Sequence, residues 1–106
     1  MTLEWILLLI TIVFEVAGTI SMKMSEGLSR PLPTIMIFVC YGICFSIFSL
    51  VVKKMDLGLA YAIWSGTGTL AICIIGILFF HETVNMLKVV SVLLVVLGLI
   101  GVKLSA

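Results

Sequence analysis

The sequence predicts an all-α integral membrane protein with four transmembrane helices in each protomer. Two observations support this prediction. Of the 106 residues, 63% are hydrophobic and 10% are charged, and the mean hydropathy is +1.43, so the chain has too little polar surface to cover a soluble globule. Charged residues, prolines and glycines also divide the chain into four apolar stretches. Each is near the length of roughly 20 residues that a helix needs to cross a bilayer.

The first expected helix covers residues 3–22 and ends before Lys23. No lysine or arginine precedes its apolar run, so we interpret it as a retained helix rather than a signal peptide. The second expected helix covers residues 31–52. It begins at Pro31 and Pro33 because proline suits the first turn of a helix.

The third expected helix covers residues 58–80 and ends before His81. The fourth covers residues 86–102 and ends before Lys103. These spans leave no room for a soluble domain, so we expect residues 1–106 to form a single transmembrane domain.

The charged residues and cysteines exclude several classes of function. Six lysines and arginines are balanced by five acidic residues, which leaves no basic stripe for nucleic acid. Cys40, Cys44 and Cys73 lie in apolar runs without a metal-binding motif, and we interpret them as small apolar side chains. The only histidine is at a helix end, and no catalytic triad or phosphate-binding loop occurs. We therefore expect no metal, no cofactor and no enzymatic activity.

The lysines and arginines do not favour either orientation in the membrane. If the N-terminus is cytoplasmic, three of the six lie on each side, which is a tie under the positive-inside rule. The inner set is Lys53, Lys54 and Lys103, and the outer set is Lys23, Arg30 and Lys88. A chain without bias can insert both ways, and two opposite copies can pair as an antiparallel dimer. The alternative is that the equal numbers on the two sides arose by chance, because only six charges are counted.

Oligomerisation is also expected because four short helices enclose little space. In the fourth helix, Ser91, Gly98 and Gly101 are small residues at helical spacing. Small residues let membrane helices approach closely, so this stripe is the candidate dimer seam. The alternative is that it packs within one protomer.

Glu15 is the residue on which the predicted chemistry depends. It lies eight residues before Lys23, which is about 12 Å along a helix and therefore near the bilayer midplane. A carboxylate there costs on the order of 3 kcal/mol, so it is expected to face an interior and to carry a function. It can bind either a proton or an organic cation, and mutual exclusion of the two would couple export to a proton gradient. The alternative is a glutamic acid that only ties helices together.

The helical neighbours of Glu15 suit a cation site. Thr11 and Thr19 lie one turn away on either side, and Gly18 keeps the same face small. The second helix adds aromatic side chains at helical spacing, namely Tyr41, Phe45 and Phe48. Aromatic faces attract organic cations, although ordinary packing is the favoured interpretation for the two phenylalanines.

The third helix carries a second set of candidate residues. Tyr61, Trp64 and Ser65 bring two aromatic rings and a hydroxyl to the membrane interior. Gly66 and Gly68 lie in mid-helix, where they allow either a hinge or a close helix contact.

Three segments resemble one family over essentially the whole chain. They are Glu-Val-Ala-Gly-Thr at 15–19, Met-Lys-Met-Ser-Glu-Gly at 22–27, and Ala-Tyr-Ala-Ile-Trp-Ser-Gly-Thr-Gly at 60–68. The chain is similar to the small multidrug resistance transporters. The resemblance implies an antiparallel dimer in a bacterial inner membrane, whose glutamates bind protons and substrate competitively.

By position, the resemblance assigns roles to individual residues. Glu15 matches the membrane glutamate of the family, and Gly66 and Gly68 match third-helix glycines linked to bending. The positions that match the substrate site are Tyr41, Tyr61, Trp64 and Ser65.

The branch of the family is a separate question. Gly18, Thr19 and Ser65 resemble the branch that exports quaternary ammonium and other lipophilic cations. Two departures from its pattern are Ser46, where a tryptophan is frequent, and Ser91, where a glycine is common. The alternatives are a guanidinium or polyamine exporter, a heterodimeric partner, or a membrane subunit that does not transport.

Overall fold

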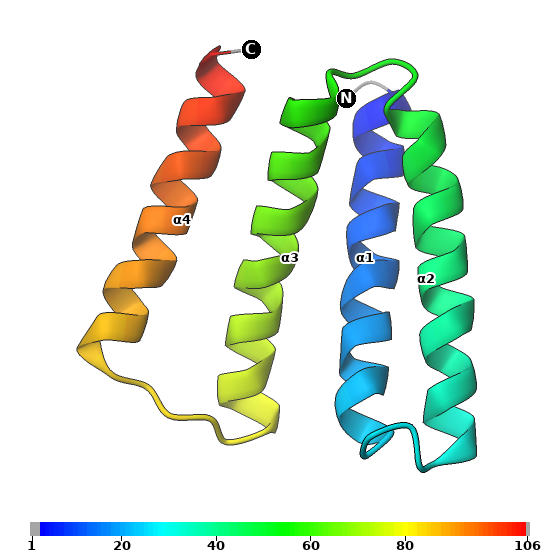
Figure 1. Cartoon of the computed structure of the whole chain (residues 1–106). Helices are drawn as coiled ribbons and strands as arrows, with labels where there is room; N and C mark the ends of the chain where they lie inside the picture. The colour runs from blue at the N-terminus through cyan, green and yellow to red at the C-terminus, as the bar shows by residue number, and fades with distance from the viewer. Residues whose placement is uncertain (1–2, 106) are drawn as a thin grey trace.

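The computed structural model describes residues 3–105 and contains four helices that run alternately up and down (Figure 1). They are α1 (Leu3–Met24), α2 (Pro31–Val51), α3 (Leu57–Phe79) and α4 (Met86–Ser105). No strand occurs in these residues, and all four helices are long and apolar enough to cross a membrane. The predicted all-α fold with four membrane spans is confirmed.

The helix ends lie close to the expected positions, with the largest difference in α4. This helix ends at Ser105 rather than near residue 102, so Lys103 belongs to its last turn instead of following it. A lysine in a last turn is favourable because it faces the negative end of the helix dipole. The ammonium of Lys103 also lies 5.1 Å from the centre of the Trp5 ring of α1.

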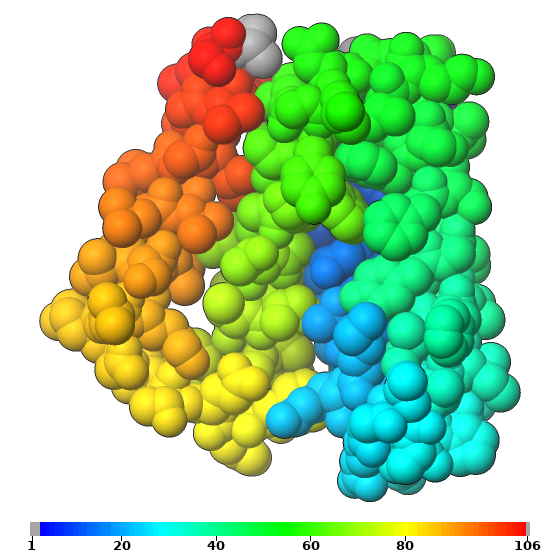
Figure 2. All heavy atoms as spheres, in the orientation of Figure 1, coloured from blue at the N-terminus to red at the C-terminus, as the bar shows by residue number. Residues whose placement is uncertain are grey.

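The helices are arranged with α1 between α2 and α3, and with α4 at the outer edge (Figure 1). Helix α1 packs against both of its neighbours, whereas α4 packs mainly against α3. Space-filling atoms of α3 and α4 separate toward the α3–α4 connection (Figure 2). Helix α4 consequently keeps most of its surface free.

The apolar core lies toward the end of the bundle where α1 begins and α2 ends. Its buried members are Leu8, Ile12, Cys44, Val51, Ala60 and Trp64. No residue of α4 is buried, and its outward side chains are large and apolar. The core therefore joins α1, α2 and α3 into one unit, and Glu15 lies on α1 beyond this core, further along the helix.

Candidate functional site

The carboxylate of Glu15 has two oxygens in different environments. Oε1 accepts a hydrogen bond of 3.1 Å from the hydroxyl of Thr19, one turn further along α1. Oε2 is buried and has no hydrogen-bond partner within residues 3–105. A buried polar atom without a partner costs free energy, so Oε2 stands out among the polar atoms of the described residues.

Helix α2 reaches this carboxylate through Tyr41. Its hydroxyl lies 2.5 Å from the hydroxyl of Thr19, which in turn contacts Glu15. The ring of Tyr41 lies against Gly18, where an added Cβ would be 3.0 Å from the ring atom Cε2. Glu15, Thr19 and Tyr41 thus form a continuous polar chain between two helices, and Gly18 leaves the room that the tyrosine needs.

Helix α3 approaches Glu15 with its backbone. A Cβ added at Gly68 would lie 2.5 Å from Oε2 of Glu15, closer than two such atoms can come. Gly68 is buried, and α3 continues as a helix through this position. Of the two predicted uses of Gly68, the structure displays the close contact, and the hinge stays a prediction.

Five aromatic rings form a continuous group, which includes Tyr41 and so is linked to the carboxylate through Thr19. Trp64 is 8% exposed, and its ring centre lies 5.8 Å from Phe45, 5.2 Å from Phe48 and 5.5 Å from Tyr61. Tyr41 stacks against Phe45 at 6.1 Å. The indole Nε1 of Trp64 is buried without a hydrogen-bond partner in the described part of the chain. The site therefore combines a carboxylate with aromatic faces, two of which, those of Phe45 and Tyr61, are more than half exposed.

Comparison with known proteins identifies the family. The family model described as "Small Multidrug Resistance protein" matches residues 3–95.

The chain belongs to the small multidrug resistance family.

Several curated relatives match over nearly their whole length. The multidrug resistance protein EbrA of Bacillus licheniformis is 37% identical, over 95% of this chain and 96% of its own. The quaternary ammonium compound-resistance protein QacG of a Staphylococcus species is 36% identical, over 92% of each chain. The guanidinium exporter of Salmonella typhimurium is 38% identical, over 98% of this chain and 99% of its own. The protein is thus a multi-pass membrane efflux transporter of a family whose members are transporters rather than enzymes.

Two predicted substrate residues, Thr11 and Ser65, donate their hydroxyl hydrogens to the preceding turn of their own helix, and their contact with substrate stays a prediction. Thr11 is fully buried and donates to the carbonyl of Leu8 at 2.7 Å. Ser65 donates to the carbonyl of Tyr61 at 2.8 Å. Hydroxyls on helices often bond to the preceding turn in this way, and spacing in the sequence does not separate that use from substrate binding.

Cys44 has a role that sequence reasoning missed. It is fully buried, and its thiol donates to the backbone carbonyl of Thr11 at 3.3 Å. The bond ties α2 to α1 one turn from Glu15. The sequence indicated only a small apolar side chain, and no feature of it pointed to the acceptor. In residues 3–105 no cluster of three or more His, Cys, Asp or Glu side chains could hold a metal.

The candidate seam of α4 faces away from the protomer. Ser91 is exposed, and a Cβ added at Gly98 or Gly101 would meet no atom within 4 Å. The alternative that these two glycines pack within one protomer is therefore wrong. A dimer seam at this position stays a prediction, as does the antiparallel arrangement.

Proposed function

We propose that this transporter exports organic cations in exchange for protons, and that both compete for Glu15. The observation that carries the proposal is the buried Oε2 atom, which has no hydrogen-bond partner in residues 3–105. Its neighbour Oε1 is held by Thr19, so Oε2 is the oxygen left to take up a proton, and a cation reaches it only when the close contact with Gly68 opens. A proton on Oε2 removes the charge that attracts a cation, and a bound cation disfavours the proton. Binding of one therefore releases the other.

The aromatic group favours a lipophilic or quaternary ammonium cation. Such a cation has no N–H donor, so its charge is stabilised by a carboxylate and by aromatic faces. Trp64 lies at the centre of the group, with Phe45 and Tyr61 more than half exposed beside it. The resistance to quaternary ammonium compounds named for QacG supports the same class of substrate.

Guanidinium is the second candidate substrate. The 38% identity to a protein named guanidinium exporter supports it as strongly as the other relatives support a quaternary ammonium. A guanidinium ion is planar and donates several hydrogen bonds. The acceptors near Glu15 are its own Oε2 and the hydroxyl oxygens of Thr19 and Tyr41.

A dimer would complete the site. One protomer leaves the rings of Phe45 and Tyr61 exposed and leaves α4 without any buried residue. The balance of lysines and arginines supports two oppositely inserted copies. The two copies would bring two Glu15 carboxylates to a shared cavity. A heterodimer with a related chain would complete the site in the same way.

The experiment that tests the proposal measures protons released by the detergent-solubilised protein near neutral pH. Benzyltrimethylammonium and guanidinium are added separately to the wild type, to Glu15→Gln and to Glu26→Gln. We expect release by the wild type and by Glu26→Gln, since Glu26 is exposed in the α1–α2 turn, and none by Glu15→Gln. Cation binding without proton release would refute the exchange mechanism, and the more effective cation identifies the substrate class.

A further inference from the structure

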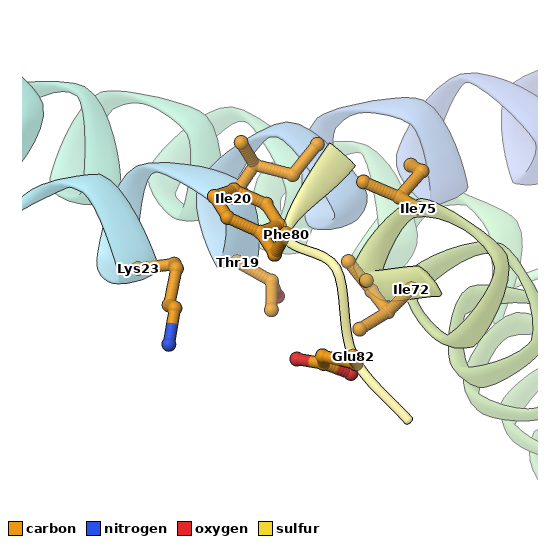
Figure 3. Close-up of a pocket in the computed structure, with 8 residues that line it drawn as sticks. Thr19, Ile20, Lys23, Ile72, Ile75, Phe80 and Glu82 are labelled. Carbon is orange, nitrogen blue, oxygen red and sulfur yellow. The ribbon is translucent and has the colours of Figure 1, made fainter. Parts of the chain in front are cut away.

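A pocket lies between the end of α1 and the end of α3. It is lined by Thr19, Ile20, Lys23, Ile72, Ile75, Gly76, Phe80 and Glu82. Figure 3 shows Thr19, Lys23 and Glu82 extending toward the same side of this pocket, which we call the Glu82 pocket. Its walls are otherwise isoleucine and phenylalanine side chains. It therefore combines an apolar surface and an aromatic ring with one acidic and one basic group.

The position of Glu82 is fixed by Gly76. The carbonyl of Gly76 accepts hydrogen bonds from the backbone N–H groups of Phe80 and Glu82, both at 3.1 Å. The Glu82 carboxylate lies against the Cα of Gly76, where an added Cβ would be 2.8 Å from the carboxyl carbon. His81, between the two donors, has a φ of 55°. This tight turn folds the acidic side chain back over the end of α3 and into the pocket.

The Glu82 pocket connects to the membrane carboxylate through Thr19. The side chain of Thr19 lines the pocket, and its hydroxyl donates to Oε1 of Glu15. A cation in the pocket is therefore one side chain away from Glu15. The pocket also lies at the end of the bundle that holds the α1–α2 and α3–α4 connections (Figure 1), where a membrane-spanning helix meets the aqueous phase.

The volume of the pocket limits what it can hold. At about 190 Å³, it is smaller than the roughly 300 to 1,000 Å³ of sites that enclose a whole drug-sized ligand. It has room for a small quaternary ammonium, or for the charged end of a larger cation whose apolar body stays outside. Such partial enclosure suits brief occupancy rather than tight binding.

We propose that the Glu82 pocket is an entry site for organic cations on their way to Glu15, and this inference rests on the proposed function. Glu82 supplies the attracting charge, and Phe80 supplies an aromatic face. Lys23 also lines the pocket, and its positive charge repels a cation. It therefore lowers the attraction that Glu82 exerts on the cation. A second carboxylate at the mouth raises the local concentration of cations and hence the association rate.

The first test is the rate of cation binding, followed by quenching of tryptophan fluorescence after rapid mixing with benzyltrimethylammonium. We expect Glu82→Gln to slow association by about five-fold, the factor for one unit charge near the path, and to slow dissociation similarly. Lys23→Gln is expected to speed association, which gives an independent result if Glu82→Gln does not fold. Glu26→Gln, with the same change of charge at the same end of the bundle, should leave the rate unchanged. Equal association rates in all variants would overturn the entry site.

The closing experiment separates the entry site from the site at Glu15. Benzyltrimethylammonium is titrated into isotopically labelled Glu15→Gln protein while backbone amide NMR signals are observed. We expect saturable shifts at Thr19, Gly76 and Glu82 that disappear when Glu82→Gln is added to the same chain. Shifts in Glu15→Gln without any proton release by the wild type would retain the pocket and reject the exchange mechanism. Proton release by the wild type without these shifts would reject the pocket and retain the mechanism.

Discussion

At the scale of single residues, the site depends on how Glu15 is held between three helices. Thr19 holds one oxygen from within α1, Tyr41 extends the contact to α2, and Gly68 lets the backbone of α3 come close to the other oxygen. A hydrogen bond from the Thr19 hydroxyl fixes Oε1, and steric contact with the backbone of α3 at Gly68 confines Oε2. Substitutions at these positions should therefore act through different physical causes.

Removing the hydroxyl of Tyr41 should weaken binding without changing the shape of the site. In Tyr41→Phe, Thr19 loses its neighbour at 2.5 Å, so the orientation of Glu15 is less well fixed. A hydrogen bond contributes about 0.5 to 1.5 kcal/mol, so we expect the dissociation constant of benzyltrimethylammonium to rise by about two- to ten-fold in calorimetric titration. Tyr61→Phe is the matched control, because no hydrogen bond of the Tyr61 hydroxyl is present in residues 3–105. An equal loss in both variants would contradict the polar chain.

Adding a methyl group at Gly68 should displace the carboxylate. In Gly68→Ala, the new Cβ would lie 2.5 Å from Oε2, and Glu15 has to move. Overpacking of this kind costs about 1 to 3 kcal/mol, and we expect binding to weaken by about ten-fold or more in the same titration. Gly42→Ala is the control, because a Cβ there meets nothing within 4 Å. Unchanged binding by Gly68→Ala would show that Oε2 does not need its present position.

At the scale of helices, α3 serves the site on one face and supports α4 on the other. Gly68 faces Glu15, whereas Gly66, two residues earlier, faces Leu99 of α4. A Cβ added at Gly66 would lie 2.9 Å from Cγ of Leu99. The two glycines of this segment thus make two separate contacts. Any bending of α3 at this point would move α4 as well as the binding site.

This contact predicts that substitutions at positions 66 and 99 are coupled. Gly66→Ala should lower the free energy of unfolding by about 1 kcal/mol, because it overpacks the contact with Leu99. In the double variant Gly66→Ala with Leu99→Ala, we expect part of that loss to be recovered. The measurement is a double-mutant cycle from denaturation in mixed micelles, with a coupling of about 0.5 kcal/mol or more. Additive effects would show that Leu99 does not press on Gly66.

The positions of the helices could be predicted because insertion in a membrane leaves few alternatives. Charges end apolar runs, and the run lengths match the bilayer thickness. The site was harder to predict. Spacing along α1 brought Thr19 and Thr11 to the same face as Glu15, yet only Thr19 donates to the carboxylate, and Thr11 donates to Leu8. The glycines at 66 and 68 were predicted together, as either a hinge or a close helix contact, and the sequence did not indicate that they face different helices. Helical periodicity gives the face of a residue but not the neighbour that the face meets.

At the scale of the whole molecule, the protomer consists of a packed unit of α1, α2 and α3 with α4 beside it. The buried core draws only on the first three helices, and α4 has no buried residue. Its exposed leucines and valines can lie against lipid or against another copy. Small residues at 91, 98 and 101 favour the second copy, because they let two helices approach closely.

A large side chain at Gly98 should weaken the dimer and spare the protomer. In Gly98→Leu, the first added atom meets nothing within the protomer, because no atom lies within 4 Å of an added Cβ, and Gly98 itself is exposed. A bulky side chain prevents the close approach that small residues allow between membrane helices, so we expect association to weaken by about ten-fold. Fluorescence energy transfer between labelled copies in vesicles measures this association. Gly58→Leu, at the open start of α3, is the control, and no difference between the two would place the dimer contact elsewhere.

Because α4 lies at the edge of the bundle, we expect that it can be replaced by the last helix of a relative without rebuilding the other three helices. Support for α4 within the protomer comes mainly from α3, and Glu15, Tyr41 and Trp64 all belong to the other three helices. With the predicted dimer seam on α4, the candidate site and the choice of partner would lie on different segments of the chain. A chimaera that takes only this last helix from a relative should acquire the relative's partner and keep its own substrate. Gene duplication followed by divergence of this one segment would then be enough to turn a self-pairing exporter into one half of a dedicated pair.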